Sequence, residues 1–159
     1  MTSLPLLLLL ASEPVSQVLT DGRVQVRIHV NLPPEAVRAE MDSPGKIAML
    51  TQAAGIESEH KDGPCWLVHR KRDLLVYSID WHTRACPTDN GLTETMLRGE
   101  GIESYRTDWQ VLPDGEGSVV QLQVTSITGL PVPLSLVQST SIKESEESLV
   151  NLKAALEAK

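Results

Sequence analysis

The sequence predicts an α+β protein in which a curved antiparallel sheet of about seven strands wraps around a long C-terminal helix. Apolar and polar residues alternate strictly from Val24 to Val30, and this period of two returns after Gly55 and continues almost to residue 128. From Leu134 to about Glu157, the apolar residues recur with the period of a helix. An antiparallel sheet with one apolar face must cover that face, and the terminal helix is the only long apolar surface available.

The first strand and two short helices are expected before residue 55. Four apolar side chains alternate with three polar ones between Val24 and Val30, which indicates a half-buried strand. Asn31-Leu-Pro-Pro-Glu ends this strand and starts a short helix that runs to about Met41. Ser43-Pro44-Gly45 breaks that helix, and a second short helix is expected from about Lys46 to Gln52.

Six further strands are expected in a meander. The Lys61-Asp-Gly-Pro64 segment has hairpin turn chemistry and separates strands at 56–60 and 65–70. A longer strand from 75 to 85 places Tyr77, Ile79 and Trp81 on one face. Turn residues at 87–91, 99–101 and 113–117 then separate strands at about 92–98, 105–111 and 120–124. The final helix carries an apolar stripe of Ile142, Leu149, Leu152 and Leu156.

Length and charge exclude several classes of protein. The chain has 159 residues, a length that suits one domain with a single core. Its formal charge of −7 repels phosphate backbones, so no nucleic acid partner is expected. The longest apolar run, Leu4 to Ala11, is about half as long as the roughly 18 residues that span a bilayer, so no integral membrane span is expected.

The N-terminal residues 1–21 are interpreted as an arm or a signal segment, followed by one domain over 22–159. The apolar run has the length of a signal-peptide core. However, no Lys or Arg precedes Arg23, and Leu9-Leu10-Ala11 is a poor cleavage site. The balance slightly favours the cytoplasm over export.

The two cysteines, Cys65 and Cys86, are expected to be free thiols. Arg70 to Asp73 is the natural polar bend between their strands, and this bend puts the cysteines several residues out of register. A disulfide needs the two Cα atoms within about 7 Å.

The same two segments contain histidines at metal-ligand spacing, as Cys65-x-x-x-His69 and His82-x-x-x-Cys86. Four residues of a strand span about 13 Å, so neither pair can bind one ion, and no metal site is expected. Clustering across the strands would bring these side chains together in only one register. The alternative is that they are ordinary surface residues.

Several segments carry a resemblance to a known superfamily. They are the strand and Pro-Pro-Glu segment from Val26 to Val37, the segment from Tyr105 to Gly117 with its Trp109 and Pro-Asp-Gly turn, the Gly129-Leu-Pro-Val-Pro133 segment, and the final helix ending Leu152-Lys-Ala-Ala-Leu-Glu. Over about residues 22–159 the chain resembles the START-like or Bet v 1-like (SRPBCC) superfamily, in particular polyketide cyclase/dehydrase-type or lipid-binding members. The resemblance implies a helix-grip fold with an apolar cavity between sheet and helix. Residues 35–41 contain no aromatic residue, so the quinone-binding branch is not indicated.

The expected cavity would be lined by residues that share the inward parity of the strands and by small residues of the last helix. The candidate ligand-binding residues are Tyr77, Ile79, Trp81, Leu97, Tyr105, Trp109, Leu122, Ser141, Ser145 and Leu149. Two alternatives remain open: the aromatic side chains simply pack against the helix, or the serines are exposed, as the neighbouring glutamates allow.

The predicted function is the binding or carriage of an apolar small molecule or lipid, without a cofactor. The alternative is a cyclase or dehydratase-type enzyme that uses Tyr77, Tyr105, Arg70 or Arg98 to orient a polyketide-like substrate. The inward positions are mostly apolar and the pattern offers no acid/base pair, so no catalytic residue is assigned and binding is favoured over catalysis. A protein-interaction module without a cavity is a third possibility.

Overall fold

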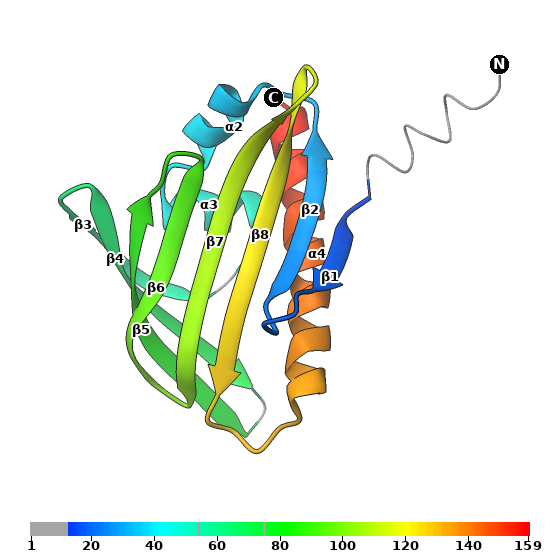
Figure 1. Cartoon of the computed structure of the whole chain (residues 1–159). Coiled ribbons are helices and arrows are strands. Elements are labelled where there is room, and N and C mark those ends of the chain that lie inside the picture. The colour runs from blue at the N-terminus through cyan, green and yellow to red at the C-terminus, as the bar shows by residue number, and fades with distance from the viewer. Residues whose placement is uncertain (1–12, 54, 75) are drawn as a thin grey trace.

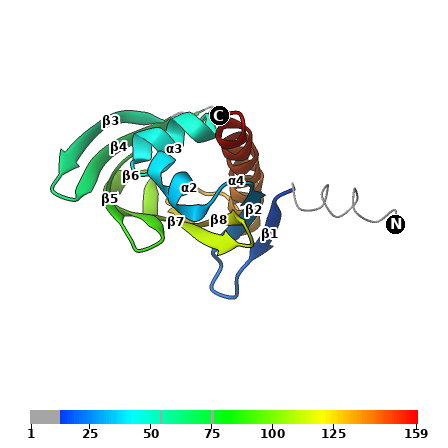
Figure 2. The same cartoon turned by 90° about the horizontal axis from the view of Figure 1, so that it is seen from above.

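An eight-stranded antiparallel sheet curls around one long helix in the computed structural model, which describes residues 13–53, 55–74 and 76–159 (Figure 1). The helix, α4 (Leu134–Glu157), lies along the open side of the sheet, and two short helices lie over one end (Figure 2). The predicted fold class is therefore confirmed. In the described part of the chain, no helix is long and apolar enough to cross a membrane.

The strands form one sheet in the order β1-β2-β8-β7-β6-β5-β4-β3. Their bounds are β1 Val15–Val18, β2 Val24–Val30, β3 Ile56–Asp62, β4 Cys65–Leu74, β5 Tyr77–Pro87, β6 Gly91–Glu100, β7 Ile102–Asp114 and β8 Gly117–Thr128. Strands β3 to β8 form the predicted meander, and β2 pairs with β8 although the two are far apart in the sequence. One strand more than expected is present.

The additional strand, β1, lies in the segment interpreted as an arm. It pairs with β2 in antiparallel register, with Val15 opposite Arg27 and Val18 opposite Val24. The connecting turn uses Gly22 at a φ of +89°, a conformation that favours glycine. The apolar run Leu4 to Ala11, which bears on the signal-segment interpretation, lies outside the described residues.

Both short helices form where the sequence predicts them, as α2 (Pro34–Glu40) and α3 (Pro44–Thr51). A proline stands in the first turn of each, where its fixed φ suits the helix and its missing N–H costs no hydrogen bond. Ser43 caps α3 by accepting a hydrogen bond from the backbone N–H of Lys46. This cap and Pro44 explain why α3 starts two residues earlier than expected.

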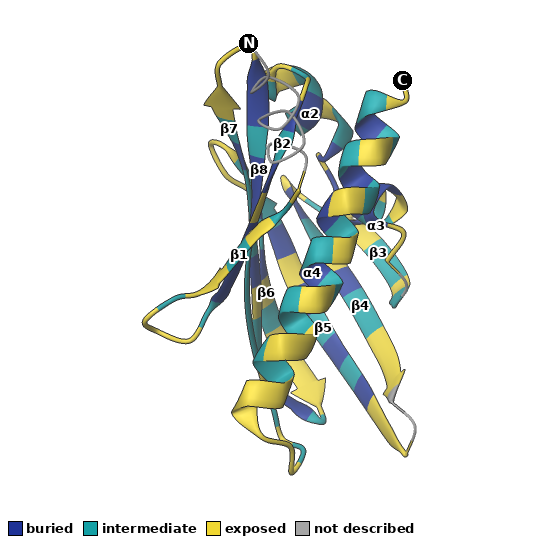
Figure 3. Ribbon diagram, turned by 90° about the vertical axis from the view of Figure 1, so that its right-hand side faces the viewer, coloured by how far each residue is buried: buried dark blue, intermediate teal, exposed yellow. Residues whose placement is uncertain are grey.

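The main hydrophobic core occupies one end of the molecule, and a smaller cluster of Ile79, Trp81 and Ile102 lies apart from it. The inward valines and Ile28 of β2 pack in the main core with residues of α2 and α3 and with Leu149, Leu152 and Leu156 of α4. The N-terminal half of α4 extends beyond this core and is more exposed (Figure 3). The predicted apolar stripe of α4 is thus confirmed, and half of the helix remains free to face a cavity.

The hairpin of β4 and β5 corrects two predictions. The strands do not bend at Arg70 to Asp73, since β4 continues through Leu74 and Trp66 pairs with Ala85. Cys65 then lies opposite Cys86, and the two form a disulfide with Cα atoms 4.3 Å apart. The prediction of two free thiols was therefore wrong.

The physical reason for this error is that the polar residues at 70–73 do not form a turn. Arg70 and Arg72 point inward instead, where Arg70 pairs with the buried Glu94 and Arg72 pairs with Glu144 of α4. Their polarity reflects ion pairs on the inner side of the sheet and not a turn.

Candidate ligand cavity

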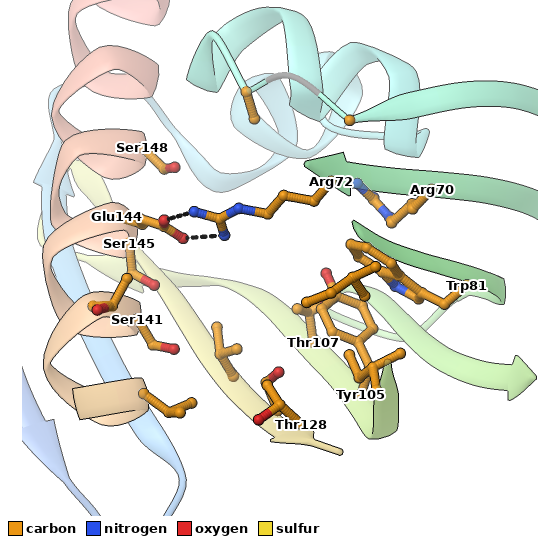
Figure 4. A pocket seen from close by; sticks show the side chains of 18 of the residues that line it. Arg70, Arg72, Trp81, Tyr105, Thr107, Thr128, Ser141, Glu144, Ser145 and Ser148 are labelled. Carbon is orange, nitrogen blue, oxygen red and sulfur yellow. Dashed lines mark hydrogen bonds and ion pairs between the residues drawn. The ribbon is translucent and has the colours of Figure 1, made fainter. Parts of the chain in front are cut away.

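A cavity of about 810 Å³ lies between the inner face of the sheet, α3 and the N-terminal half of α4. It occupies the place predicted for it, beside β5, β7 and the terminal helix (Figure 4). Its walls are mainly apolar. Their apolar side chains include Ile47, Val76, Ile79, Leu92, Ile102, Leu122, Val124, Leu130, Val132, Leu136 and Val137.

Most of the candidate residues line this cavity. They are Tyr77, Ile79, Trp81, Tyr105, Trp109, Leu122, Ser141 and Ser145. Figure 4 shows that Ser141, Ser145 and Ser148 project from α4 toward the opposite sheet wall, so small side chains here leave room. Ser145 is buried, in contrast to the expectation that the serines could simply be exposed.

Two candidates do not line the cavity. Leu97 lies on β6 and is 59% exposed. His82 of β5 pairs with Arg98 of β6, and the next residue, Thr83, pairs with Met96, so Leu97 has no partner on β5. This β-bulge interrupts the alternation of inward and outward side chains, and the alternation therefore could not predict which way Leu97 points. Leu149 is fully buried in the core instead.

A buried ion pair, which the sequence analysis did not identify, stands in the cavity wall. The Arg70 guanidinium donates two hydrogen bonds to Glu94, from Nε at 2.6 Å and from Nη2 at 2.8 Å. The Thr83 hydroxyl donates a third to the same carboxylate at 2.7 Å. The Glu94 side chain is only 4% exposed. Glu94 stands two residues after the inward-facing Leu92 on the same strand. This spacing was the one sequence signal that could have placed the Glu94 side chain inside.

Burial and charge set the protonation of this wall. Burial lowers the pKa of Arg70, but the neighbouring Tyr105 and Glu94 raise it more, so its pKa lies above the ordinary value and the charge is kept. Burial raises the pKa of Tyr105, and the positive charge of Arg70 lowers it by a smaller amount, so that the pKa is about 12. Tyr105 is therefore a neutral phenol at physiological pH.

One polar group of the wall lacks a partner. Trp81 is 8% exposed, and its indole N–H has no hydrogen-bond partner within the residues that the structure describes. The Trp81 and Tyr105 rings lie 5.5 Å apart at an angle of 58°, and Figure 4 shows both side chains on the same wall. An unsatisfied buried donor costs about 1–3 kcal/mol, and this N–H is itself covered by protein atoms, so a molecule in the cavity does not reach it directly.

A second ion pair joins the two sides of the cavity. Arg72 of β4 donates two hydrogen bonds to Glu144 of α4, one of them from Nη1 to Oε2 at 2.9 Å (Figure 4). Both side chains are nearly half exposed, so this pair contributes little to stability. The cavity lining also includes exposed apolar residues, among them Val76 and Leu136.

A curved antiparallel sheet, closed by one long helix over an apolar cavity, defines the helix-grip class of START and Bet v 1-like proteins. The family described as "Polyketide cyclase / dehydrase and lipid transport" matches residues 21–157. The chain belongs to this family. No curated protein sequence matches it.

Solved structures of low sequence identity share the fold. A START superfamily protein from Mycobacterium smegmatis has a TM-score of 0.67 at 15% identity, with 86% of this chain and 97% of that chain covered. The ZhuI aromatase/cyclase from Streptomyces sp. R1128 has a TM-score of 0.59 at 14% identity, covering 86% and 92%. A STAR-related lipid transfer protein fragment from Xanthomonas axonopodis has a TM-score of 0.60 at 11% identity, covering 91% and 92%.

Proposed function

We propose that the protein binds and carries an apolar small molecule or lipid in the cavity between its sheet and α4. The observation that carries this proposal is the cavity itself, about 810 Å³ in volume and mainly apolar in its walls. Sites for small molecules typically measure about 300–1,000 Å³ and bury most of the ligand among apolar side chains. The family includes lipid transport in its description.

The polar groups of the wall favour a ligand with a hydrogen-bond acceptor. The neutral Tyr105 hydroxyl stands on the cavity wall, where it can donate a hydrogen bond to a bound molecule. A carbonyl or hydroxyl oxygen on an otherwise apolar molecule would accept it. No cofactor is needed for this role.

Catalysis is the second candidate, favoured by the position of Arg70 beside Tyr105. An arginine and a phenol in an apolar cavity could orient a polyketide-like substrate for cyclisation or dehydration. Against this, Arg70 is already engaged by Glu94 in a bidentate pair, and Glu94 also accepts from Thr83. This network contains no free acid or base, so binding is the stronger proposal.

The proposal is tested by native mass spectrometry of the purified protein, followed by titration with an environment-sensitive apolar dye. We expect a co-purifying apolar molecule, or saturable dye binding that this molecule displaces. Ser145→Phe, which projects a ring into the cavity, should weaken dye binding at least about tenfold. Ser139→Phe is the matched control, because Ser139 lies on the same helix but is exposed and outside the cavity lining.

Equal dye binding by both variants and the wild type would contradict the proposal. Conversion of a linear polyketide mimic to a cyclised product, lost in Tyr105→Phe while dye binding persists, would instead support the enzyme.

A further inference from the structure

The outer face of the β4–β5 hairpin, on the side away from the cavity, brings two histidines together. His69 and His82 are directly paired in the register of the two strands. Their rings are stacked, with centroids 4.3 Å apart and planes within 2° of parallel. The His69 Nε2 atom lies 2.9 and 3.0 Å from the two carboxylate oxygens of Asp80.

The backbone holds these side chains in place. Cys65 and Cys86 stand opposite each other four residues further along the same strands, so they share the face and the pairing type of the two histidines. Their Cα separation of 4.3 Å is typical of a non-hydrogen-bonded pair, the arrangement that brings facing side chains closest. The disulfide thus fixes the register that pairs the imidazoles.

The chemistry of the three groups matches one class of ligand. One nitrogen or oxygen atom from each of His69, Asp80 and His82 lies within 4.8 Å of the others. Imidazole nitrogen together with carboxylate oxygen is a donor set that suits Zn²⁺, Cu²⁺ and Ni²⁺. All three side chains are partly exposed, so water can complete the coordination.

We propose that His69, Asp80 and His82 form a binding site for a divalent transition-metal ion of the zinc and copper type on the outer face of the hairpin. Ligand distances of about 2.1 Å place neighbouring tetrahedral ligand atoms about 3.4 Å apart. The ligand atoms must therefore approach one another by about an ångström. Rotation about their broad terminal torsions supplies this movement, with loss of the His69–Asp80 hydrogen bond.

Charged residues of both signs are the strand neighbours of this site. In the strand register, Lys71 of β4 and Glu100 of β6 stand opposite Asp80, and Arg98 of β6 stands opposite His82. Burial lowers the pKa of His82, and the Arg98 charge and His69 lower it further against the effect of Asp80.

From the sequence no metal site was expected, because ligand pairs along one strand lie too far apart and clustering across the strands requires one particular register. In the observed register, the two cysteines form a disulfide and the two histidines face each other across the strands. Asp80 and His82 alternate with Ile79 and Trp81, which line the cavity from the opposite face of β5. The metal site is thus separate from the cavity and does not depend on the proposed function.

The test is a calorimetric titration of the untagged, metal-free full chain with ZnCl₂. We expect one ion per chain, and binding at least about tenfold weaker in His69→Ala, His82→Ala and Asp80→Asn, since even indirect partners of a metal contribute that much. His60→Ala is the matched control, because His60 is an exposed strand histidine outside this cluster. It should bind Zn²⁺ as the wild type does.

A second measurement keeps the proposal testable if a variant does not fold. Electron paramagnetic resonance of the wild-type protein with one equivalent of Cu²⁺ should show two imidazole nitrogens as ligands. The proposal is overturned if the wild type shows no saturable binding of one ion, if the His69→Ala/His82→Ala double variant binds Zn²⁺ as well as the wild type, or if Cu²⁺ has no nitrogen ligands.

Discussion

At the scale of single residues, the chemistry of the cavity wall depends on groups whose polarity gave a misleading signal in the sequence. Arg70, in a polar run that looked like a turn, is instead a buried cation with Glu94 as its partner. Alternation placed Tyr105 and Trp81 on the inward face, because strand parity depends only on spacing. It could not place Arg70 opposite Glu94, since that pairing depends on the register between β4, β5 and β6.

The buried ion pair makes a prediction for stability. Glu94→Leu leaves the Arg70 charge without its partner, and we expect a loss of about 3 kcal/mol in the free energy of unfolding. The double variant Arg70→Met/Glu94→Leu should recover much of this loss, because no charge then remains buried. Urea denaturation measures both.

The exposed pair of Arg84 and Asp62 is the control, since both side chains are nearly half exposed. Asp62→Asn should cost no more than about 1 kcal/mol. Similar costs for Glu94→Leu and Asp62→Asn would contradict the structural importance assigned to Glu94.

The Tyr105 phenol makes a prediction for pH. Because its folded pKa is raised to about 12, it should ionise well above the ordinary value of 10.0. The folded state holds this proton more tightly, so the related stability is complete below about pH 10 and is lost as the pH rises toward 12.

Tyr77→Phe leaves Tyr105 as the only tyrosine, so absorbance at the phenolate band reports it alone. A midpoint near pH 10 in this folded variant would show that the phenol is exposed to solvent. Tyr105→Phe should show a smaller decline in stability between pH 10 and 12 than the wild type.

At the scale of elements, the order of β2 to β8 and of the helices followed from the sequence, but β1, the ends of several elements and the strand register did not. Periodicity identified β2, β5 and α4 because burial of one face fixes the spacing of their apolar residues. The β4–β5 turn was misplaced because the polar residues at 70–73 suggested a bend, whereas the strands pair on through Leu74 and Tyr77 in a register that places Cys65 opposite Cys86. The bulge at Leu97 is also a register effect that parity could not reveal.

The disulfide is expected to stabilise the hairpin. Cys65 and Cys86 are separated by 21 residues, and closing a loop of this length is worth about 3 kcal/mol in the chain-entropy description. Cys65→Ala/Cys86→Ala should lose about that much stability in urea denaturation. Thiol counting on denatured, unreduced wild-type protein should find no free thiol, and two thiols per chain would disprove the bond.

The two halves of α4 should respond differently to truncation. Leu152 is fully buried, so Leu152→Ala should cost about 2–5 kcal/mol through lost contacts and a cavity. Val150 on the same helix is 46% exposed, and Val150→Ala should change stability by about 0.5 kcal/mol or less. Thermal and urea denaturation of both variants checks this contrast.

At the scale of the whole molecule, a packed core at one end supports a hollow region at the other. Core residues of β2, α2, α3 and the C-terminal half of α4 fill the first end, and the cavity occupies the second. The order of elements and the sheet-around-helix arrangement could be predicted, because they follow from apolar faces that must be covered. The volume left beneath the helix could not, because it depends on how all side chains pack together.

This division predicts unequal local stability. Amides of β2 and of α4 beyond Leu149 should exchange slowly with deuterium, because many buried apolar contacts hold them. Amides between Leu130 and Ser141, next to the cavity and exposed apolar side chains, should exchange faster. Addition of a cavity-binding dye should protect this second group selectively. Uniform exchange along α4 would contradict the two-part description.

The pairing of β2 with β8 also has a consequence for how the chain is made. Val26 pairs with Leu122, and α4, which begins more than 100 residues after β2 ends, packs on β2. The apolar face of β2 is therefore covered only after β8 and α4 have left the ribosome. Such distant contacts slow folding, so we expect refolding over about milliseconds to seconds and a growing chain that is prone to aggregation until α4 emerges.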